Sequence, residues 1–306
     1  TSPEADAYQT SFHPSTFVLS SPFSPVLALL VIGLAACTEP GPSIADRRPD
    51  APPSAPAFQD LPYAVNAPDA TFELPDELEE ISGLTVLSNG HIGAVQDEDG
   101  LLFEIDPETG RVLTMEEFGG DGDYEGLEAT PDALWVLKSN GTVYELQRAG
   151  ETEIETESFN TDLSSRNDAE GLGYDAEGNR LLIALKEHPG KDLGKVRAIY
   201  AFDLATRALS EAPFLLLDRG VVDTNGVNFK PSALAVRPGT REIYILSSVK
   251  KSLIVVLPDG TIQSAVALSP ELHRQPEGIA FAPDGTLFIS NEGAGGTATL
   301  HRFSPR

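Results

Sequence analysis

Short apolar runs, each followed by a tight turn, recur along the chain from about residue 80 onward. The clearest copy opens at Glu170-Gly171-Leu172, turns at residues 175–179 and continues as the apolar run 181–184. The other copies open at Glu80, Glu125, Ser232 and Glu277. Apolar runs of this length, bounded by Gly, Pro, Asn and Asp, are typical of β-strands joined by hairpin turns.

The intervals between these copies indicate a true repeat. Three of the four intervals are 45 residues, and the one from Glu170 to Ser232 is 62 residues. Periods of about 40–50 residues are typical of β-propellers, because each small sheet buries its faces only against its neighbours. The longer interval places an insertion of about 17 residues in the third repeat. The sequence therefore predicts an all-β, five-bladed β-propeller.

The segment before the first repeat is predicted to close the ring. Residues 70–74 have the alternation of a strand, and the last repeat supplies only three strands. We expect this N-terminal strand to complete the last blade, which leaves no unpaired inner edge. No stretch has a strong helical period, so almost no helix is expected in the propeller, residues 69–306.

The first part of the chain has a different character. Residues 25–36 form an apolar run of the length of a signal-peptide core, too short to span a bilayer as a helix. They end in Leu34-Ala35-Ala36-Cys37, which resembles the lipobox of bacterial lipoproteins. That resemblance implies a signal peptide over residues 1–36 and a lipidated Cys37. The alternative is a buried apolar helix with an inert cysteine.

Residues 37–68 are predicted to be a lipid-anchored linker. Eight prolines lie among Ser, Ala and Asp in this segment, a composition that stays extended. Thr38, after the cysteine, lacks the acidic side chain associated with inner-membrane retention in such lipoproteins. We therefore expect anchoring in the bacterial cell envelope, at the outer membrane and facing the periplasm.

Charge and cysteine content exclude some classes of function. The formal net charge is −26, which argues against nucleic acid, since phosphates require basic patches. The same charge favours solubility and cation binding. The single cysteine excludes an intrachain disulfide and a thiolate metal cluster.

Carboxylates are predicted to gather at one end of the propeller channel. The first strand of each blade lines the channel, so its opening residue points toward the axis. The residues at this position are Glu80, Glu125, Glu170, Ser232 and Glu277. The second strand returns to the same end and supplies second-rank candidates. They are Asp97, Asn291 and Glu292. The same strand ends also carry Lys138 and Lys186.

Four carboxylates around a narrow axis repel one another unless they are protonated, paired with cations or bound to a metal. Oxygen ligands select a hard cation, Ca²⁺ before Mg²⁺. The sequence therefore predicts a calcium site formed by the glutamates. The alternative is that each glutamate caps backbone N–H groups of a neighbouring blade while Lys138 and Lys186 neutralise the remaining charge.

At these residues the chain resembles the SdiA-regulated family of bacterial envelope proteins. The resemblance runs from about Glu73 to Phe303 and rests on the Glu-Gly-Leu openings, on residues 281–285 and on residues 290–293. It implies a five-bladed propeller with a calcium site and no established activity. Ser232 departs from the glutamate pattern and makes the ring asymmetric.

We therefore expect a monomeric, calcium-stabilised protein of the cell envelope that serves as a binding platform. Its partner would be an unknown small molecule or protein that binds at the channel rim. The Glu-Gly opening is also similar to that of phytase-like esterases and gluconolactonase-type propellers. This second resemblance implies a metal-dependent hydrolase, a phosphoesterase or lactonase, that uses the same axial metal. A scaffold with an empty channel is a third class. The basic loop at residues 186–197 is expected to be either a solvated surface loop or a lid or anion contact over one end of the ring.

Overall fold

The protein is described here by a computed structural model, which covers residues 59–149, 153–223 and 226–306. The predicted signal peptide, Cys37 and most of the linker lie outside these ranges and stay predictions. Within the described ranges no helix is both long and apolar enough to cross a membrane.

Five antiparallel sheets, or blades, make up the described domain. Blade 1 contains β2 (Ile81–Val86), β3 (Ile92–Gln96), β4 (Leu101–Ile105) and β5 (Val112–Glu117). Blade 2 contains β6 (Tyr124–Ala129), β7 (Leu134–Lys138), β8 (Val143–Ala149) and β9 (Glu153–Phe159). Blade 3 contains β10 (Ala169–Asp175), β11 (Arg180–Leu185), β12 (Val196–Asp203), β13 (Ala208–Leu209) and β14 (Leu215–Asp218). Blade 4 contains β15 (Ala233–Val236), β16 (Ile243–Ser247), β17 (Ser252–Val256) and β18 (Ile262–Ala267). Blade 5 contains β19 (Pro276–Phe281), β20 (Leu287–Asn291), β21 (Thr299–Phe303) and β1 (Ala70–Glu73).

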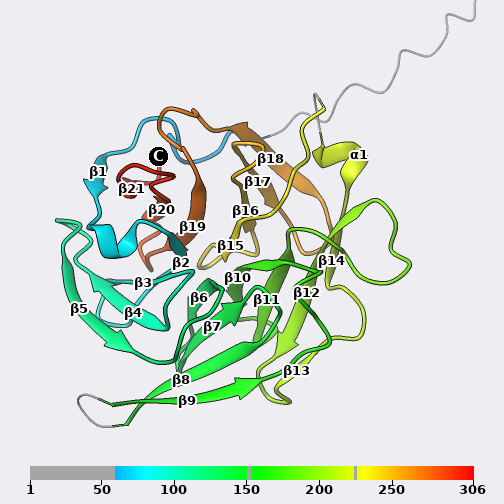
Figure 1. Cartoon of the computed structure of the whole chain (residues 1–306). Helices are drawn as coiled ribbons and strands as arrows, with labels where there is room; N and C mark the ends of the chain where they lie inside the picture. The colour runs from blue at the N-terminus through cyan, green and yellow to red at the C-terminus, as the bar shows by residue number, and fades with distance from the viewer. Residues whose placement is uncertain (1–58, 150–152, 224–225) are drawn as a thin grey trace, which may run out of the picture. The chain divides into compact units, whose positions relative to one another are not determined.

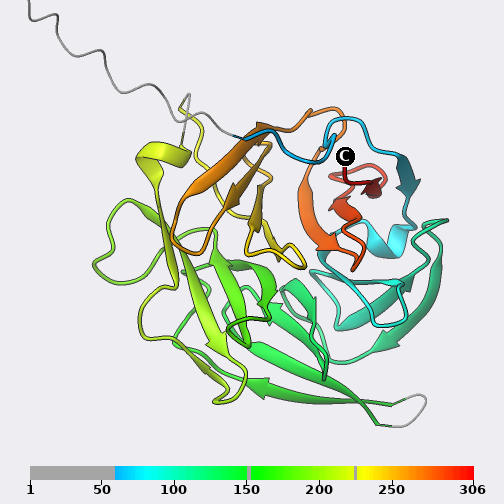
Figure 2. The ribbon, with the colours of Figure 1, turned by 180° about the vertical axis from the view of Figure 1, so that it is seen from behind.

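The first strands of the five blades surround a common axis. β2 contacts β6, and the contacts continue through β10, β15 and β19 back to β2. Both views show these strands at the centre of the ring, with the later strands of each blade outside them (Figure 1, Figure 2). The predicted five-bladed propeller is confirmed. Only a short 3₁₀ turn (Asp76–Leu78) and the four-residue helix α1 (Arg219–Val222) interrupt the β-structure of the described residues.

The N-terminal strand closes the ring as predicted. β1 pairs antiparallel with β21, from Ala70 opposite Arg302 to Glu73 opposite Thr299. This pairing makes blade 5 a four-stranded sheet in the order β1-β21-β20-β19. Strands far apart in the sequence therefore hold the two ends of the domain together.

The core consists of apolar layers between neighbouring blades. Five separate clusters of buried side chains exist in the described residues, and each joins one pair of adjacent sheets. Phe103 of blade 1, for example, packs in one cluster with Phe288 and Leu300 of blade 5. Alternation along each strand thus buries one face against each neighbour.

Turn residues fix the pairing of the first two strands. Gly90 follows β2 with φ of 86°, and Gly285 follows β19 with φ of 89°, a region that strains L side chains. The amide of each glycine donates to a carbonyl three residues earlier, at 2.8 Å and 2.9 Å respectively. The Asn-Gly and Pro-Asp-Gly signals therefore mark real hairpin turns.

The insertion in the third repeat enlarges blade 3. β12 has eight residues and pairs with two short partners, β13 and β14, in place of a single outer strand. The helix α1 follows β14, and residues 186–195 connect β11 to β12. The insertion therefore lies on the outside of the blade and in the loop after its second strand.

Candidate functional site

Three glutamates stand at bulges in the innermost strands. In blades 2, 3 and 5 the ladder between the first and second strands skips one residue. The skipped residues are Glu125, Glu170 and Glu277. A bulge leaves its extra residue unpaired and re-aims the side chain. The Glu-Gly opening of the repeat is therefore the sequence mark of a bulge beside the axis.

The glycine after each glutamate allows neighbouring blades to approach closely. A Cβ atom added to Gly126 would lie 2.6 Å from Cβ of Leu172, and one added to Gly171 would lie 2.9 Å from Cβ of Leu234. Such distances are well inside van der Waals contact, so a larger residue would push the first strands apart. Glycine here sets the width of the channel.

The three bulge glutamates line one small cavity on the axis. Its volume is about 10 Å³, the room of a single water molecule or ion. Glu170 is 3% exposed and Glu277 is 6% exposed, while Glu125 is half-buried. The structure thus brings together three of the four glutamates predicted to share the axis.

Glu80, the fourth predicted ring residue, is exposed and lies just before β2. Ser82 is the structural equivalent of Glu125, because Gly83 makes the same kind of close contact with the next blade as Gly126 does. A Cβ atom on Gly83 would lie 2.5 Å from the backbone N of the residue after Gly126. The prediction that Glu80 stands level with the other glutamates is therefore wrong by two residues.

Serines occupy the ring position in the two blades that lack a glutamate. The hydroxyl of Ser82 donates to the carbonyl of Tyr124 at 2.6 Å, and that of Ser232 donates to the carbonyl of Pro276 at 2.7 Å. Each serine thereby binds the backbone immediately before a glutamate of the neighbouring blade. The serines help to hold the bulged strands in place.

Lys186 provides a buried countercharge for the axial carboxyl groups. Its ammonium forms an ion pair and hydrogen bond with Glu170. Burial, followed by repulsion from Glu277, raises the pKa of Glu170 well above its usual range. Burial and the charge of Glu292 raise the pKa of Glu277 to about 8. Burial and Glu170 likewise raise the pKa of Glu125.

The second-rank candidates fall into two groups. Asp97 and Glu292 lie near Glu80, and these three residues form the acidic rim. Burial, followed by the charge of Glu80, raises the pKa of Asp97 to about 6. Burial, followed by the charge of Asp97, raises the pKa of Glu292 to about 7. Asn291 is 2% exposed, and its amide donates to Thr299 at 3.3 Å across the β20–β21 ladder. Its hydrogen bond therefore joins strands of its own blade.

The axial donor set fits a hard cation in chemistry and size. All its side-chain donors are carboxylate oxygens, and three carboxylates with one ammonium leave two negative charges unbalanced when all are ionised. Within the described ranges, no three His, Cys, Asp or Glu side chains are already spaced as a ligand set. Binding would therefore require the three carboxyl groups to come closer together and Glu170 to separate from Lys186.

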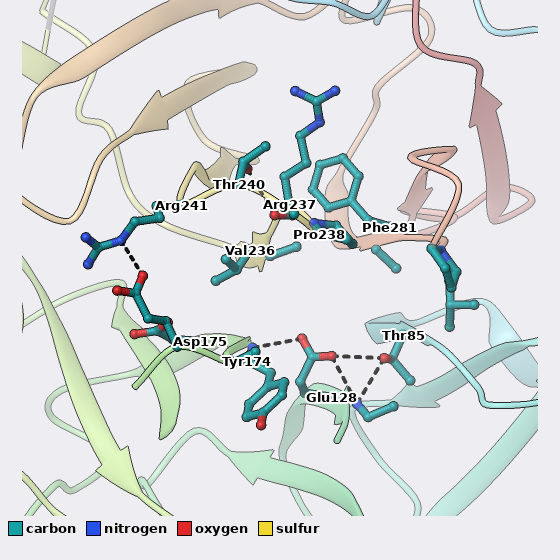
Figure 3. Close-up of a pocket in the computed structure, with 18 residues that line it drawn as sticks. Thr85, Glu128, Tyr174, Asp175, Val236, Arg237, Pro238, Thr240, Arg241 and Phe281 are labelled. Carbon is teal, nitrogen blue, oxygen red and sulfur yellow. Dashed lines mark hydrogen bonds and ion pairs between the residues drawn. The ribbon is translucent and has the colours of Figure 1, made fainter. Parts of the chain in front are cut away.

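A larger cavity, which the sequence analysis missed, lies at the opposite end of the axis. It has a volume of about 300 Å³ and is lined by the last residues of all five first strands. Figure 3 shows Glu128 on its floor, beneath Val236, Arg237 and Phe281. A charged residue within the apolar first strand of blade 2 was the signal that could have revealed it.

Raising the pH should destabilise the metal-free domain between about pH 6.5 and 8.5. Glu277 and Glu128 each have a folded pKa of about 8 against 4.5 for the free side chain. Above pH 4.5 the unfolded chain releases the protons of these two carboxyl groups, while the folded state keeps them until about pH 8. The stability that the two groups contribute is therefore fully present below pH 4.5 and is lost as the pH rises through 8. Thermal unfolding in a chelator should show a fall in Tm of at least about 5 °C.

The chosen pH window avoids an opposing group. Burial lowers the pKa of His273 from 6.5 to about 4, so its contribution is lost only as the pH falls below 6.5. Replacing Glu277 with Gln should reduce the slope, whereas replacing the exposed Glu157 with Gln should not. A Tm that rises across this window would contradict the assignment.

Comparisons with known proteins agree with this architecture. A family model described as SdiA-regulated matches residues 68–294. The crystal structure of Myxococcus xanthus glutaminyl cyclase is similar over 78% of this chain and 95% of its own, with 16% identity and a TM-score of 0.54. A luciferin-regenerating enzyme matches with 12% identity over 78% of this chain and 95% of its own, with a TM-score of 0.49. At 16% identity the cyclase structure supports the fold alone, but the family match covers most of the propeller. The chain therefore belongs to the SdiA-regulated family.

Proposed function

We propose that the propeller binds a hard divalent cation, Ca²⁺ before Mg²⁺, at Glu125, Glu170 and Glu277. The observation that carries the proposal is the convergence of three bulge glutamates on a buried cavity of about 10 Å³. Bulges re-aim side chains, and a cavity of this size accepts one ion. A divalent cation would balance the charge that Lys186 leaves uncompensated.

The protein is further proposed to act as a binding platform in the bacterial cell envelope. In this proposal Cys37 carries the lipid anchor, and the proline-rich linker holds the propeller away from the outer membrane, on its periplasmic side. An unknown small molecule or protein would bind at the acidic rim. Membrane fractionation of a Cys37→Ser variant tests the anchor, since retention of that variant in the membrane fraction would contradict it.

Calorimetric titration of the metal-stripped protein with Ca²⁺ tests the axial site. Glu170→Gln should weaken binding at least about tenfold, because it removes a buried anionic ligand. Glu157→Gln on the outer strand β9 is the matched control and should bind as the unmodified protein does. If the unmodified protein takes up no Ca²⁺, the glutamates are structural groups neutralised by Lys186.

Lys186 distinguishes the two interpretations. If a cation competes with the ammonium for Glu170, Lys186→Met should tighten Ca²⁺ binding by about tenfold or more. If Lys186 only neutralises the glutamates, the same variant should lose stability and gain no affinity. A Ca²⁺ titration measures the affinity and a thermal melt measures the stability, and together they distinguish the two outcomes.

A metal-dependent hydrolase at the same rim is the second candidate. The observation that favours it is the pKa of Glu292, raised to about 7 by burial and by neighbouring carboxylates, which suits a general base at neutral pH. A bound cation would supply Lewis-acid polarisation of a phosphoester or lactone. Hydrolysis of either class of substrate that is lost in Glu292→Gln would support this alternative, and its absence would favour the platform.

A further inference from the structure

The cavity of about 300 Å³ at the far end of the axis is separate from the axial site formed by Glu125, Glu170 and Glu277. Between the two ends, the axial cavity is lined by apolar side chains of every first strand. They are Leu84, Leu127, Leu172, Leu234 and Ile279. The far cavity opens beyond them, where the first strands end. What it binds therefore does not depend on the proposed cation site.

The space at this end arises from small residues. Glu128 lies three positions after the bulge glutamate of blade 2, and the equivalent positions in the other blades hold Thr85, Gly173, Ala235 and Ala280. One large side chain thus enters a ring of small ones. The volume of about 300 Å³ lies at the lower end of pockets for small molecules.

Glu128 is held in place by neutral donors. One of its oxygens accepts hydrogen bonds from the hydroxyl of Thr85 at 3.2 Å and from the amide of Ala129 at 3.0 Å. The other accepts from the amide of Tyr174 at 3.2 Å. Three neighbouring blades therefore fix the carboxyl group on the cavity floor (Figure 3).

The charged groups at the mouth are already balanced. Arg241 pairs with Glu177 at 2.8 Å, Arg180 with Asp175 at 2.7 Å, and Arg237 with Glu242 at 3.0 Å. In the described part of the chain no Lys, Arg or His side chain forms an ion pair with Glu128. The carboxyl group on the floor is thus the unbalanced acidic group of this cavity.

We propose that the far cavity binds a small organic cation whose ammonium group meets Glu128 and whose apolar body packs against Val236 and Phe281. A partly buried carboxylate without a cation is unfavourable, and a desolvated ammonium group offsets that cost. Val86, Ala129, Ala235 and Ala280 add apolar surface beside the two named residues. The other charged lining residues, Asp175, Glu177, Arg237 and Arg241, are those already paired at the mouth. Apolar surface combined with a small number of fixed polar groups is typical of small-ligand sites.

Proton release accompanies binding in this proposal. Burial raises the pKa of Glu128 to about 8, so the carboxyl group is mostly protonated at neutral pH when the cavity is empty. An ammonium group favours the carboxylate form, and the displaced proton leaves to solvent. Tyr174 and the three ion pairs at the mouth are the other titratable or charged groups facing this site.

Calorimetry of the full chain with benzylamine, benzyl alcohol and benzoate tests the proposal. Benzylamine should bind at least about tenfold more tightly than benzyl alcohol, and benzoate should be the weakest of the three. The heat of benzylamine binding at about pH 7 should differ between phosphate and Tris buffers in proportion to the protons released. A purely structural Glu128 would show neither effect.

Two variants and a control complete the test. Glu128→Gln should lower benzylamine affinity at least about tenfold, to the level of benzyl alcohol. That change also alters the group that accepts the hydrogen bond of the Tyr174 amide, so a second variant is needed. Val236→Trp places a large side chain in the cavity from a partly buried position and leaves Glu128 intact, and it should block benzylamine. Glu157→Gln, at an exposed position on the outer strand β9, should bind as the unmodified protein does. Absence of benzylamine binding, equal binding of the neutral analogue, or undiminished binding by Val236→Trp would overturn the proposal.

Discussion

A chain that begins at residue 75 is expected to unfold at a much lower urea concentration than one that begins at residue 59. The missing segment contains β1, which completes blade 5, and three side chains that are at most 4% exposed, Tyr63, Val65 and Leu74. Burying one large apolar side chain contributes about 1.5–3 kcal/mol, so their loss removes on the order of 5–8 kcal/mol. That is comparable to the whole stability of a typical domain, about 5–15 kcal/mol.

The loss should be reversible in trans. A synthetic peptide of residues 59–74 added to the shorter chain should restore part of the urea midpoint, because the peptide supplies the same pairing with β21. Circular dichroism follows both experiments. If the shorter chain unfolds at the same urea concentration as the longer one, closure of the ring does not depend on β1.

Adding a side chain at Gly126 is the second change with a large expected effect. The new Cβ atom would lie 2.6 Å from Cβ of Leu172 and 3.3 Å from Cβ of Leu137, both of them buried in packed layers. Overpacking of this kind costs about 1–3 kcal/mol, and Gly126→Val should cost more than Gly126→Ala. Urea unfolding monitored by circular dichroism measures the difference.

Gly120 provides the matched control. It is exposed, and a Cβ atom there would have no neighbour within 4 Å. Gly120→Ala should change the free energy of unfolding by less than about 0.5 kcal/mol. Equal losses in Gly120→Ala and Gly126→Ala would show that backbone entropy, and not contact between blades, accounts for the glycine. Ala233 occupies the equivalent position of blade 4, so the strand spacing there already accommodates a methyl group.

The register of blade 1 shows where sequence reasoning was limited. An interval of 45 residues aligned Glu80 with Glu125. The contact of Gly83 with the next blade aligns Ser82 with Glu125 instead. A repeat length tolerates a shift of two residues because the loops absorb it, whereas a close approach of backbones does not. The glycine was therefore a better marker of register than the glutamate.

Local and periodic features of the chain were enough to predict the fold of the described domain. Strand alternation, the turn signals at Gly90 and Gly285, and the repeat interval are local or periodic properties, and they were sufficient to predict five blades and the closing strand. They act through backbone conformation and burial of one face, which depend mainly on residues close in sequence.

Which charged groups pair with one another depends on the closed ring. The pairing of Lys186 with Glu170, the size of the axial cavity, and the floor of the far cavity at Glu128 each depend on strands from different blades. Side-chain direction at a bulge and the distance between blades follow from packing around the axis, and no periodic pattern encodes them. Charges interact over distances that only the closed ring establishes. The gathering of the axial glutamates could be predicted, whereas the specific partner of Lys186 and the whole far cavity at Glu128 emerged from the structure.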